Sequence, residues 1–257
     1  LERGRGGCGG VIDEAGQLED FLPISYRTAK EEQYVQFLWE AFNDNCESGK
    51  YQFAFLAYHM LTMCFVYFNI WQIKLIKPAD FATALVGFNK EMEKELLEST
   101  SPFTFHVVSE SNVMRFLKLI QCDNSKIGTY TKLVKDRNET AHSNGNIFFS
   151  TEAELSAKIH EILRVVAEIQ GHSEAVIVDG YKRFLLESAD PEERQHIDPV
   201  DQVREVLIHE NYMSLADLDF CAKFDIAEIV DHPYYVEIQA LHSETQVWVE
   251  NEEVLVE

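Results

Sequence analysis

Apolar residues recur at helical spacing along most of the first 186 residues of the chain. Side chains three, four and seven positions apart lie on one face of a helix, so each such run predicts an amphipathic helix. The predicted helices cover residues 28–45, 53–76, 78–99, 111–122, 124–144, 151–169 and 176–186. No run of strand-like alternation separates them. Residues 25–186 are therefore predicted to form an all-α helical bundle.

The segment 53–76 is the most apolar part of the chain and is long enough to cross a bilayer. Its polar residues His59, Thr62, Asn69 and Gln72 are spaced so that they share one side of a helix. Polar groups at the centre of a bilayer are costly. We therefore expect a central helix packed by neighbouring helices and no membrane contact, and membrane attachment through this segment is only a third hypothesis.

The two ends of the chain depart from the bundle pattern. Residues 1–24 begin with a glycine-rich stretch that holds little to bury, and we expect this segment to be flexible. Residues 187–257 predict helices that start at Asp198 and Ser214, followed by alternating runs that favour strands at 234–239, 246–249 and 254–256. Two helices and a small sheet would make this extension similar to a winged helix.

The charged residues are also distributed unevenly between the predicted bundle and the C-terminal extension. The whole chain has a formal net charge of −22, and residues 187–257, with 19 acidic and three basic residues, carry −16 of it. Residues 111–137 hold six basic and two acidic residues, a net charge of +4. Phosphate affinity comes from clustered Lys and Arg, so the net negative charge of the chain excludes nonspecific binding along nucleic acid. Residues 111–137 are the one region that favours binding of a polyanion.

The cysteines and the known motif patterns narrow the chemistry further. The five cysteines are scattered and form no C-x-x-C pair, which favours free thiols in a reducing compartment. No apolar signal segment opens the chain, so we expect a cytoplasmic protein. The sequence contains no H-E-x-x-H helix, zinc-ligand spacing or Walker A motif. We therefore expect neither a metal nor a cofactor.

The strongest chemical signal is the run Arg137-Asn138-Glu139-Thr140-Ala141-His142, near the end of a predicted helix. Asn138 and His142 are four residues apart and would share a helical face beside Arg137. Arginine is a permanent cation suited to phosphate, and histidine can transfer protons near neutral pH. The alternative is a surface helix end, in which Arg137 pairs with an acid and His142 caps carbonyl groups.

This run resembles the signature of the HEPN superfamily of prokaryotic ribonucleases, toxins and defence proteins: an Arg, a polar residue, a few variable residues and a His. Arg137, Asn138 and His142 match these three positions. The resemblance implies a HEPN-like bundle over about residues 25–186, a homodimer with both motifs at its interface, and metal-independent cleavage of RNA. The implied catalytic residues are Arg137, Asn138 and His142.

Further residues near the motif are candidates for RNA binding. Lys132 and Lys135 can contact phosphate, and Tyr130 can stack on a base, although its spacing also fits core packing. His59 can approach the site or serve as a hydrogen-bonded core histidine. A second Arg-x4-His run, from Arg204 to His209, lies in acidic surroundings and is interpreted as part of an amphipathic helix.

Two functions from different classes follow. The first is an endoribonuclease of a toxin or antiviral defence system, with the acidic extension docking a protein partner such as an antitoxin or folding over the basic cluster. The second is a noncatalytic HEPN-like helical module that assembles with other proteins. The overall acidity of the chain favours the second, and the motif with its basic surroundings favours the first.

Overall fold

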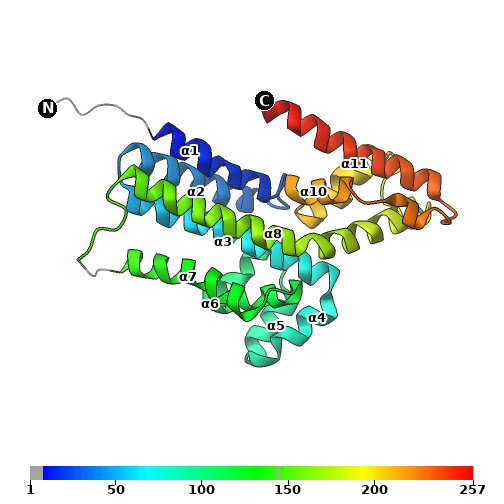
Figure 1. Ribbon diagram of the computed structural model, residues 1–257. Helices are drawn as coiled ribbons and strands as arrows, with labels where there is room; N and C mark the ends of the chain where they lie inside the picture. The colour runs from blue at the N-terminus through cyan, green and yellow to red at the C-terminus, as the bar shows by residue number, and fades with distance from the viewer. Residues whose placement is uncertain (1–7, 143–144, 257) are drawn as a thin grey trace.

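The computed structural model describes residues 8–142 and 145–256. Over these residues the regular structure is helical, and the only β interaction is an isolated bridge between Pro23 and Ser214. Figure 1 shows the helices lying side by side around a long central pair. The prediction of an all-α fold is confirmed for the described chain.

The centre of the fold is α3 (Tyr51–Ile76). A three-residue turn joins it to α2 (Ala29–Glu47), so the two helices are antiparallel neighbours, and α8 (Glu152–Ala189) also packs on α3. By length and composition α3 is able to cross a membrane, yet 83% of its most apolar 18-residue window is buried by the rest of the chain. The helix therefore has the surroundings of a core helix.

The polar stripe on α3 is buried along its whole length, as the spacing predicts. Polar groups inside a protein need hydrogen-bond partners, and those of the stripe come from three other helices. The bonds join His59 to Glu110 (2.9 Å), Asn69 to Ser173 (2.7 Å) and Gln72 to Asp217 (2.8 Å). The stripe thus positions the elements packed around α3.

The segment predicted as one helix over 78–99 is broken into three pieces. They are α4 (Pro78–Ala84), the 3-10 turn η2 (Leu85–Gly87) and α5 (Lys90–Glu98). The break occurs at Phe88, whose backbone is extended, and Asn89 then accepts a hydrogen bond from the Met92 N–H and caps α5. The prediction of a continuous helix is wrong because this cap outweighs the helical spacing of the apolar residues.

Short helical turns connect α5 to α7. They are η3 (Pro102–Val107), α6 (Glu110–Val113) and η4 (Met114–Ile120). Phe105 and Phe116 from these turns are buried against Phe81 of α4. This aromatic cluster lies beside α6, which packs against α7, and Glu110 of α6 bonds to His59 of α3.

The last two bundle helices are α7 (Asn124–Ala141) and α8. Asp123 caps α7 by accepting a hydrogen bond from the Lys126 N–H, so the helix begins at Asn124 as its spacing predicts. At the start of α8, Thr151 and Glu154 form a capping box. Gly171 does not interrupt α8, which continues to Ala189.

The N-terminal segment is ordered where the structure describes it. Helix α1 (Gly9–Gly16) and the turn η1 (Gln17–Phe21) bury Val11, Ala15 and Leu18 in the main core. The prediction of a flexible segment over 1–24 is wrong for residues 8–24, because these apolar side chains have a core to join; residues 1–7 lie outside the described chain.

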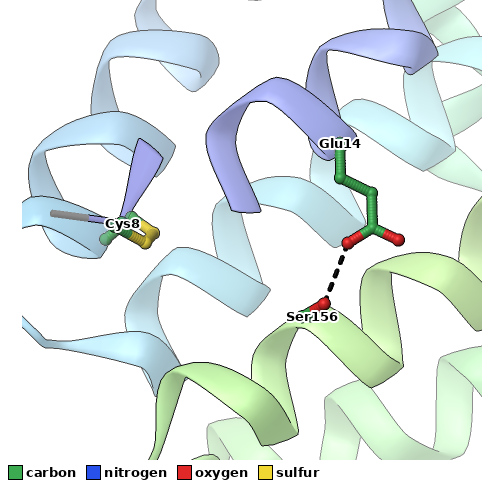
Figure 2. The surroundings of a disulfide bond; sticks show 4 residues. Cys8, Glu14 and Ser156 are labelled. Atoms are coloured by element: carbon green, nitrogen blue, oxygen red, sulfur yellow. Dashed lines mark hydrogen bonds between the residues drawn. A yellow bond between two sulfur atoms is a disulfide. The ribbon is translucent and has the colours of Figure 1, made fainter. Parts of the chain in front are cut away.

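Two cysteines are paired in the structure. Cys8 and Cys46 form a disulfide that links the start of α1 to the end of α2, and Glu14 accepts a hydrogen bond from Ser156 of α8 nearby (2.9 Å; Figure 2). The prediction of free thiols is wrong for this pair, which spacing along the chain could not reveal. Cys64, Cys122 and Cys221 are buried free thiols.

The acidic extension is helical and contains no winged-helix sheet in its described residues. Its elements are α9 (Pro199–Asp201), the π-helix η5 (Gln202–His209), α10 (Leu215–Ala222), the 3-10 turn η6 (Ile226–Ile229) and α11 (Tyr235–Val256). The predicted strands at 234–239, 246–249 and 254–256 are wrong. The buried positions of α11, Ile238, Leu241, His242 and Thr245, have helical spacing, and no Gly or Pro separates the first two strand-like runs.

The extension shares α8 with the bundle. The last third of α8 contributes Ile177, Tyr181 and Leu185 to a second core that the extension completes. The boundary predicted at residue 186 therefore falls within a continuous helix. In Figure 1 the extension lies beside the C-terminal half of α8, while α7 lies on the opposite side of the bundle. The extension does not cover the basic cluster of α7.

Candidate functional site

The motif lies at the accessible end of α7. Arg137 and Asn138 occupy its last turns and are half-buried, and the helix ends at Ala141 rather than at residue 144. Ala141 is exposed, although its spacing predicts an inward position. The C-terminal end of a helix carries partial negative charge, which favours cations such as Arg137 and protonated histidine there.

His142 follows as the C-cap residue with an extended backbone, and its N–H donates to the Asn138 carbonyl (3.2 Å). Its side chain is exposed. Because the residue has left the helix, His142 and Asn138 do not share a helical face as their spacing predicts. The motif instead joins a helix-bound Arg137 to a histidine on the connecting segment between α7 and α8.

Arg137 is held by a carboxylate from another element. Its Nη2 forms an ion pair with Oε1 of Glu110, the first residue of α6. The other oxygen of Glu110, Oε2, lies 2.9 Å from Nε2 of His59, whose side chain is 1% exposed. Glu110 is 20% exposed and Arg137 is 29% exposed, so the network runs from the core to the surface. His59 is therefore a hydrogen-bonded core histidine that is also connected to the motif.

The electrostatics of this network favour an ionised Glu110. Burial alone would raise its pKa, but the interactions with His59 and Arg137 outweigh burial and lower it. Nearby Tyr67 has a raised pKa, mainly through burial and next through the negative charge of Glu110, while Arg137 acts in the opposite direction. Glu110 and Arg137 thus form a charged pair whose charges act on Tyr67 of α3.

The two predicted phosphate-binding lysines lie on the exposed side of α7. Lys135 is exposed and forms no salt bridge with any described residue, whereas Lys132 lies 3.8 Å from Glu161 of α8. A third lysine, Lys158 of α8, is almost fully buried between Asp136 and Glu161. Burial alone would lower its pKa, but the bonds to both carboxylates raise it, so Lys158 serves to join α7 to α8.

Tyr130 is part of the core. Its side chain is fully buried and its hydroxyl donates to Glu168 of α8 (3.4 Å). A ring in this position cannot stack on a base, so the packing interpretation of Tyr130 fits the structure and the interpretation as an RNA contact does not.

An open groove of about 550 Å³ lies between α7 and the start of α8. Its charged lining is mainly acidic, with Asp136, Glu139, Glu154 and Glu161 against the single cation Lys158. Such a lining repels phosphate. The exposed basic side chains of the segment 111–137 lie elsewhere, on η4 and on α7: Arg115, Lys118, Lys132 and Lys135.

The second Arg-x4-His run, from Arg204 to His209, does not bring its two end residues to a common partner. Arg204 pairs with Asp201 and Glu205 at the surface of η5, and Nδ1 of His209 lies 3.2 Å from the Ser25 hydroxyl. Both residues lie on a helix rich in buried apolar positions, in agreement with the interpretation as an amphipathic helix.

Sequence reasoning misses the most direct partner of the motif. Glu110 lies 27 positions before Arg137, on a four-residue helix, and no spacing rule relates the two. The polar stripe of α3 gives only an indirect signal, because a buried His59 must find a partner on whichever element packs against it.

The described residues contain no cluster of three His, Cys, Asp or Glu side chains arranged to hold a metal ion. No protein-family model matches the chain, and neither the curated proteins nor the solved structures give a match. The functional assignment must therefore come from the residues themselves.

Proposed function

We propose that this chain is a metal-independent endoribonuclease of the HEPN type that acts in a prokaryotic toxin or antiviral defence system. The observation that carries the proposal is the end of α7, where the cation Arg137 and the exposed His142 lie within six residues of one another. Cleavage of RNA by its own 2′-hydroxyl needs a cation that stabilises the charge on the phosphate and a group that transfers protons, and Arg137 and His142 are residues of these two kinds.

In this reaction the 2′-oxygen of the ribose loses its proton and attacks the adjacent phosphorus. The bond from phosphorus to the 5′-oxygen of the next nucleotide breaks, and that oxygen takes up a proton. The products are a 2′,3′-cyclic phosphate and a 5′-hydroxyl. Arg137 would neutralise the phosphate, His142 would transfer protons, and Asn138 would orient the reacting groups.

The ion pair with Glu110 leaves Arg137 able to take this role. A guanidinium has five N–H donors, and the ion pair with Glu110 engages only Nη2. Glu110 would fix the side chain while the remaining donors face the substrate. It also neutralises part of the charge, so we expect weak RNA binding by a single chain.

The assembly state is part of the proposal. We expect a homodimer that brings two α7 ends into one cleft in the cytoplasm, and a protein partner such as an antitoxin at residues 187–257, where the charge of −16 would attract a basic surface. Chemical crosslinking through a single cysteine introduced at Lys135 would capture the dimer if the two α7 helices face each other.

Cleavage of mixed tRNA and mRNA in EDTA tests the activity. Wild-type protein should cleave, and His142→Ala and Arg137→Ala should lose at least about a hundredfold in rate, as removal of an acid-base group or a charge-stabilising group does. The fragments should end in 2′,3′-cyclic phosphate.

A matched control is His160→Ala, which changes an exposed histidine on α8 that pairs with Glu14. This variant should cleave like the wild type. Equal cleavage by wild type and His142→Ala would assign the activity to a contaminant or another site and would refute the proposal.

A noncatalytic assembly module is the second candidate, and two observations favour it. Arg137 is paired with Glu110, and the groove beside it is acidic. If wild-type protein and His142→Ala both fail to cleave, while Glu110→Gln alters the assembly state measured by light scattering, the network serves assembly.

A further inference from the structure

An aromatic groove of about 720 Å³ opens on the side of α3 away from α8, between α2, α5, η3 and α6. The buried residues Met63, Cys64 and Tyr67 of α3 form its floor. Its walls include Tyr34 and Phe103, whose rings meet edge to face at 5.3 Å. This volume lies within the range of about 300–1,000 Å³ that is usual for sites that bury a small organic group.

The charged groups around the groove are mainly carboxylates. Its other polar groups include the exposed imidazole of His106 and the hydroxyls of Thr28, Thr100, Ser101 and Thr104. Glu95 is exposed at the rim and Glu110 lines the end near α6, whereas the lining contains one lysine, the exposed Lys30. Glu31 also lines the groove but is fully used by hydrogen bonds to Ser101, Tyr212 and its own helix cap. An anion is disfavoured in such a site, and a flat neutral group with N–H donors fits it.

The groove is continuous with the motif through one residue. Glu110 lines the groove, and its Oε1 pairs with Arg137. A group seated in the groove would therefore lie next to any phosphate held by Arg137.

We propose that the groove binds a nucleobase of the RNA substrate, next to the phosphate that Arg137 contacts, and that it favours bases with an exocyclic amino group over uracil. Aromatic side chains bind bases of single-stranded RNA by their faces and edges. Carboxylates accept hydrogen bonds from exocyclic amines, and Glu95, exposed at the rim of the groove, offers such an acceptor. This inference rests on the proposed function and specifies the substrate as single-stranded RNA with a preferred base at the cut.

The test measures binding without cleavage. Full-length His142→Ala protein is titrated with fluorescent 2′-O-methyl oligonucleotides of adenosine, cytidine or uridine, which cannot be cut at the 2′-oxygen. Adding Tyr34→Ala should weaken binding of the adenosine and cytidine oligonucleotides about five- to a hundredfold, the range for the loss of one aromatic–base contact. Tyr34→Phe, which keeps the ring, should bind like its parent.

The matched control is Phe37→Ala, one turn further along α2. Phe37 is 60% exposed and does not line the groove, so this variant removes an aromatic ring from the same helix without touching the site. Its binding should be unchanged. If Tyr34→Ala fails to fold, Glu95→Gln at the exposed rim replaces it and should reduce the preference for adenosine and cytidine over uridine.

The outcomes separate this inference from the proposed reaction. Base-dependent binding that requires Tyr34, together with wild-type protein that does not cleave RNA, would support the groove and refute the nuclease. Cleavage that requires His142 but is indifferent to Tyr34 and Glu95, in both affinity and the base at the cut, would overturn the groove and keep the nuclease. Equal losses in Tyr34→Ala and Phe37→Ala would also overturn it.

Discussion

Each end of the polar stripe on α3 is bonded to a carboxylate from another helix, but the two carboxylates lie in different surroundings. At one end His59 bonds to Glu110, which reaches the surface and pairs with the charged Arg137. At the other end Gln72 bonds to Asp217, which is sealed between the bundle and the acidic extension. One carboxylate is connected to solvent and to a cation, and the other is enclosed among neutral groups.

The difference appears in the direction of the two pKa shifts. Burial raises the pKa of both carboxyl groups, but Glu110 ends below its usual value because His59 and Arg137 stabilise its charged form. Asp217 ends above its usual value, because burial outweighs the hydrogen bonds it accepts from the Ser214 N–H and the two neutral amides of Gln170 and Gln72. A charged partner suits the first end to binding and chemistry, whereas neutral donors suit the second to holding two layers together.

Removing the extension tests whether the sealed end is structural, and it has the largest expected effect. Deletion of residues 190–257 would expose Tyr181, Leu185 and the donor groups of Gln72 and Gln170. An ordinary domain has a net stability of only about 5–15 kcal/mol, so losing the buried apolar contacts of this second core is expected to unfold the shortened chain. We expect the shortened chain to aggregate or to lose cooperative unfolding in circular dichroism and gel filtration. A soluble fragment with the melting temperature of the intact chain would show that the extension is an independent module.

A single substitution at the sealed end should have the next largest effect. Asp217→Ala removes the acceptor of Gln170 Nε2 (2.7 Å) and of the Ser214 N–H (3.0 Å). It also removes the shortest hydrogen bond of Gln72 Nε2 (2.8 Å), which keeps only longer contacts with two backbone carbonyls. We expect a loss of about 3–5 kcal/mol in the free energy of unfolding by urea, because buried donors are left unpaired. The control is Asp219→Ala on the same helix, which removes a surface pair with Lys223 and should cost less than about 1 kcal/mol. Similar losses in both variants would contradict the comparison.

The open end should show a smaller and salt-dependent coupling. In a double-mutant cycle of Glu110→Gln and Arg137→Gln we expect a coupling energy of about 1 kcal/mol in unfolding, since the pair is partly exposed. The coupling should fall further in 1 M salt, which screens charges beyond about 3 Å. Strictly additive losses would mean that the ion pair contributes nothing to stability and does not position Arg137.

The sequence predicts the local part of this picture. The spacing of His59, Asn69 and Gln72 is sufficient to predict a buried polar stripe, because three residues on one side of an apolar helix must all find partners inside the fold. The capping box at Thr151 is equally local. The position of Arg137 near a helix end is predictable in the same way, although the helix ends three residues early and leaves His142 outside it.

Features that depend on distant contacts could not be predicted. Glu110 meets Arg137 because the aromatic cluster around Phe105 and Phe116 packs α6 against α7, which no local pattern encodes. The strand-like runs of α11 become helical because Ile238 and Leu241 pack on α8 and α10, a case in which tertiary packing decides over propensity. The disulfide of Cys8 and Cys46 likewise depends on α1 lying beside α2.

The pH dependence of stability is the smallest expected effect. It distinguishes the two ends of the stripe only by the direction in which the stability of the variants changes relative to the wild type. Folding lowers the pKa of Glu110, so ionised Glu110 stabilises the folded chain, and this contribution is lost as the pH falls through the folded pKa. Folding raises the pKa of Asp217, so ionised Asp217 opposes folding, and that cost disappears as the pH falls through its folded pKa toward its ordinary value of 3.8. Urea unfolding from pH 7 to pH 3 should show the advantage of the wild type over Glu110→Gln shrinking once the pH falls below about 4.5, the ordinary pKa of a glutamate. Over the same range the advantage over Asp217→Ala should grow. If both advantages move in the same direction, Asp217 is held ionised by its neutral donors, and the two ends of the stripe do not differ in charge as we infer.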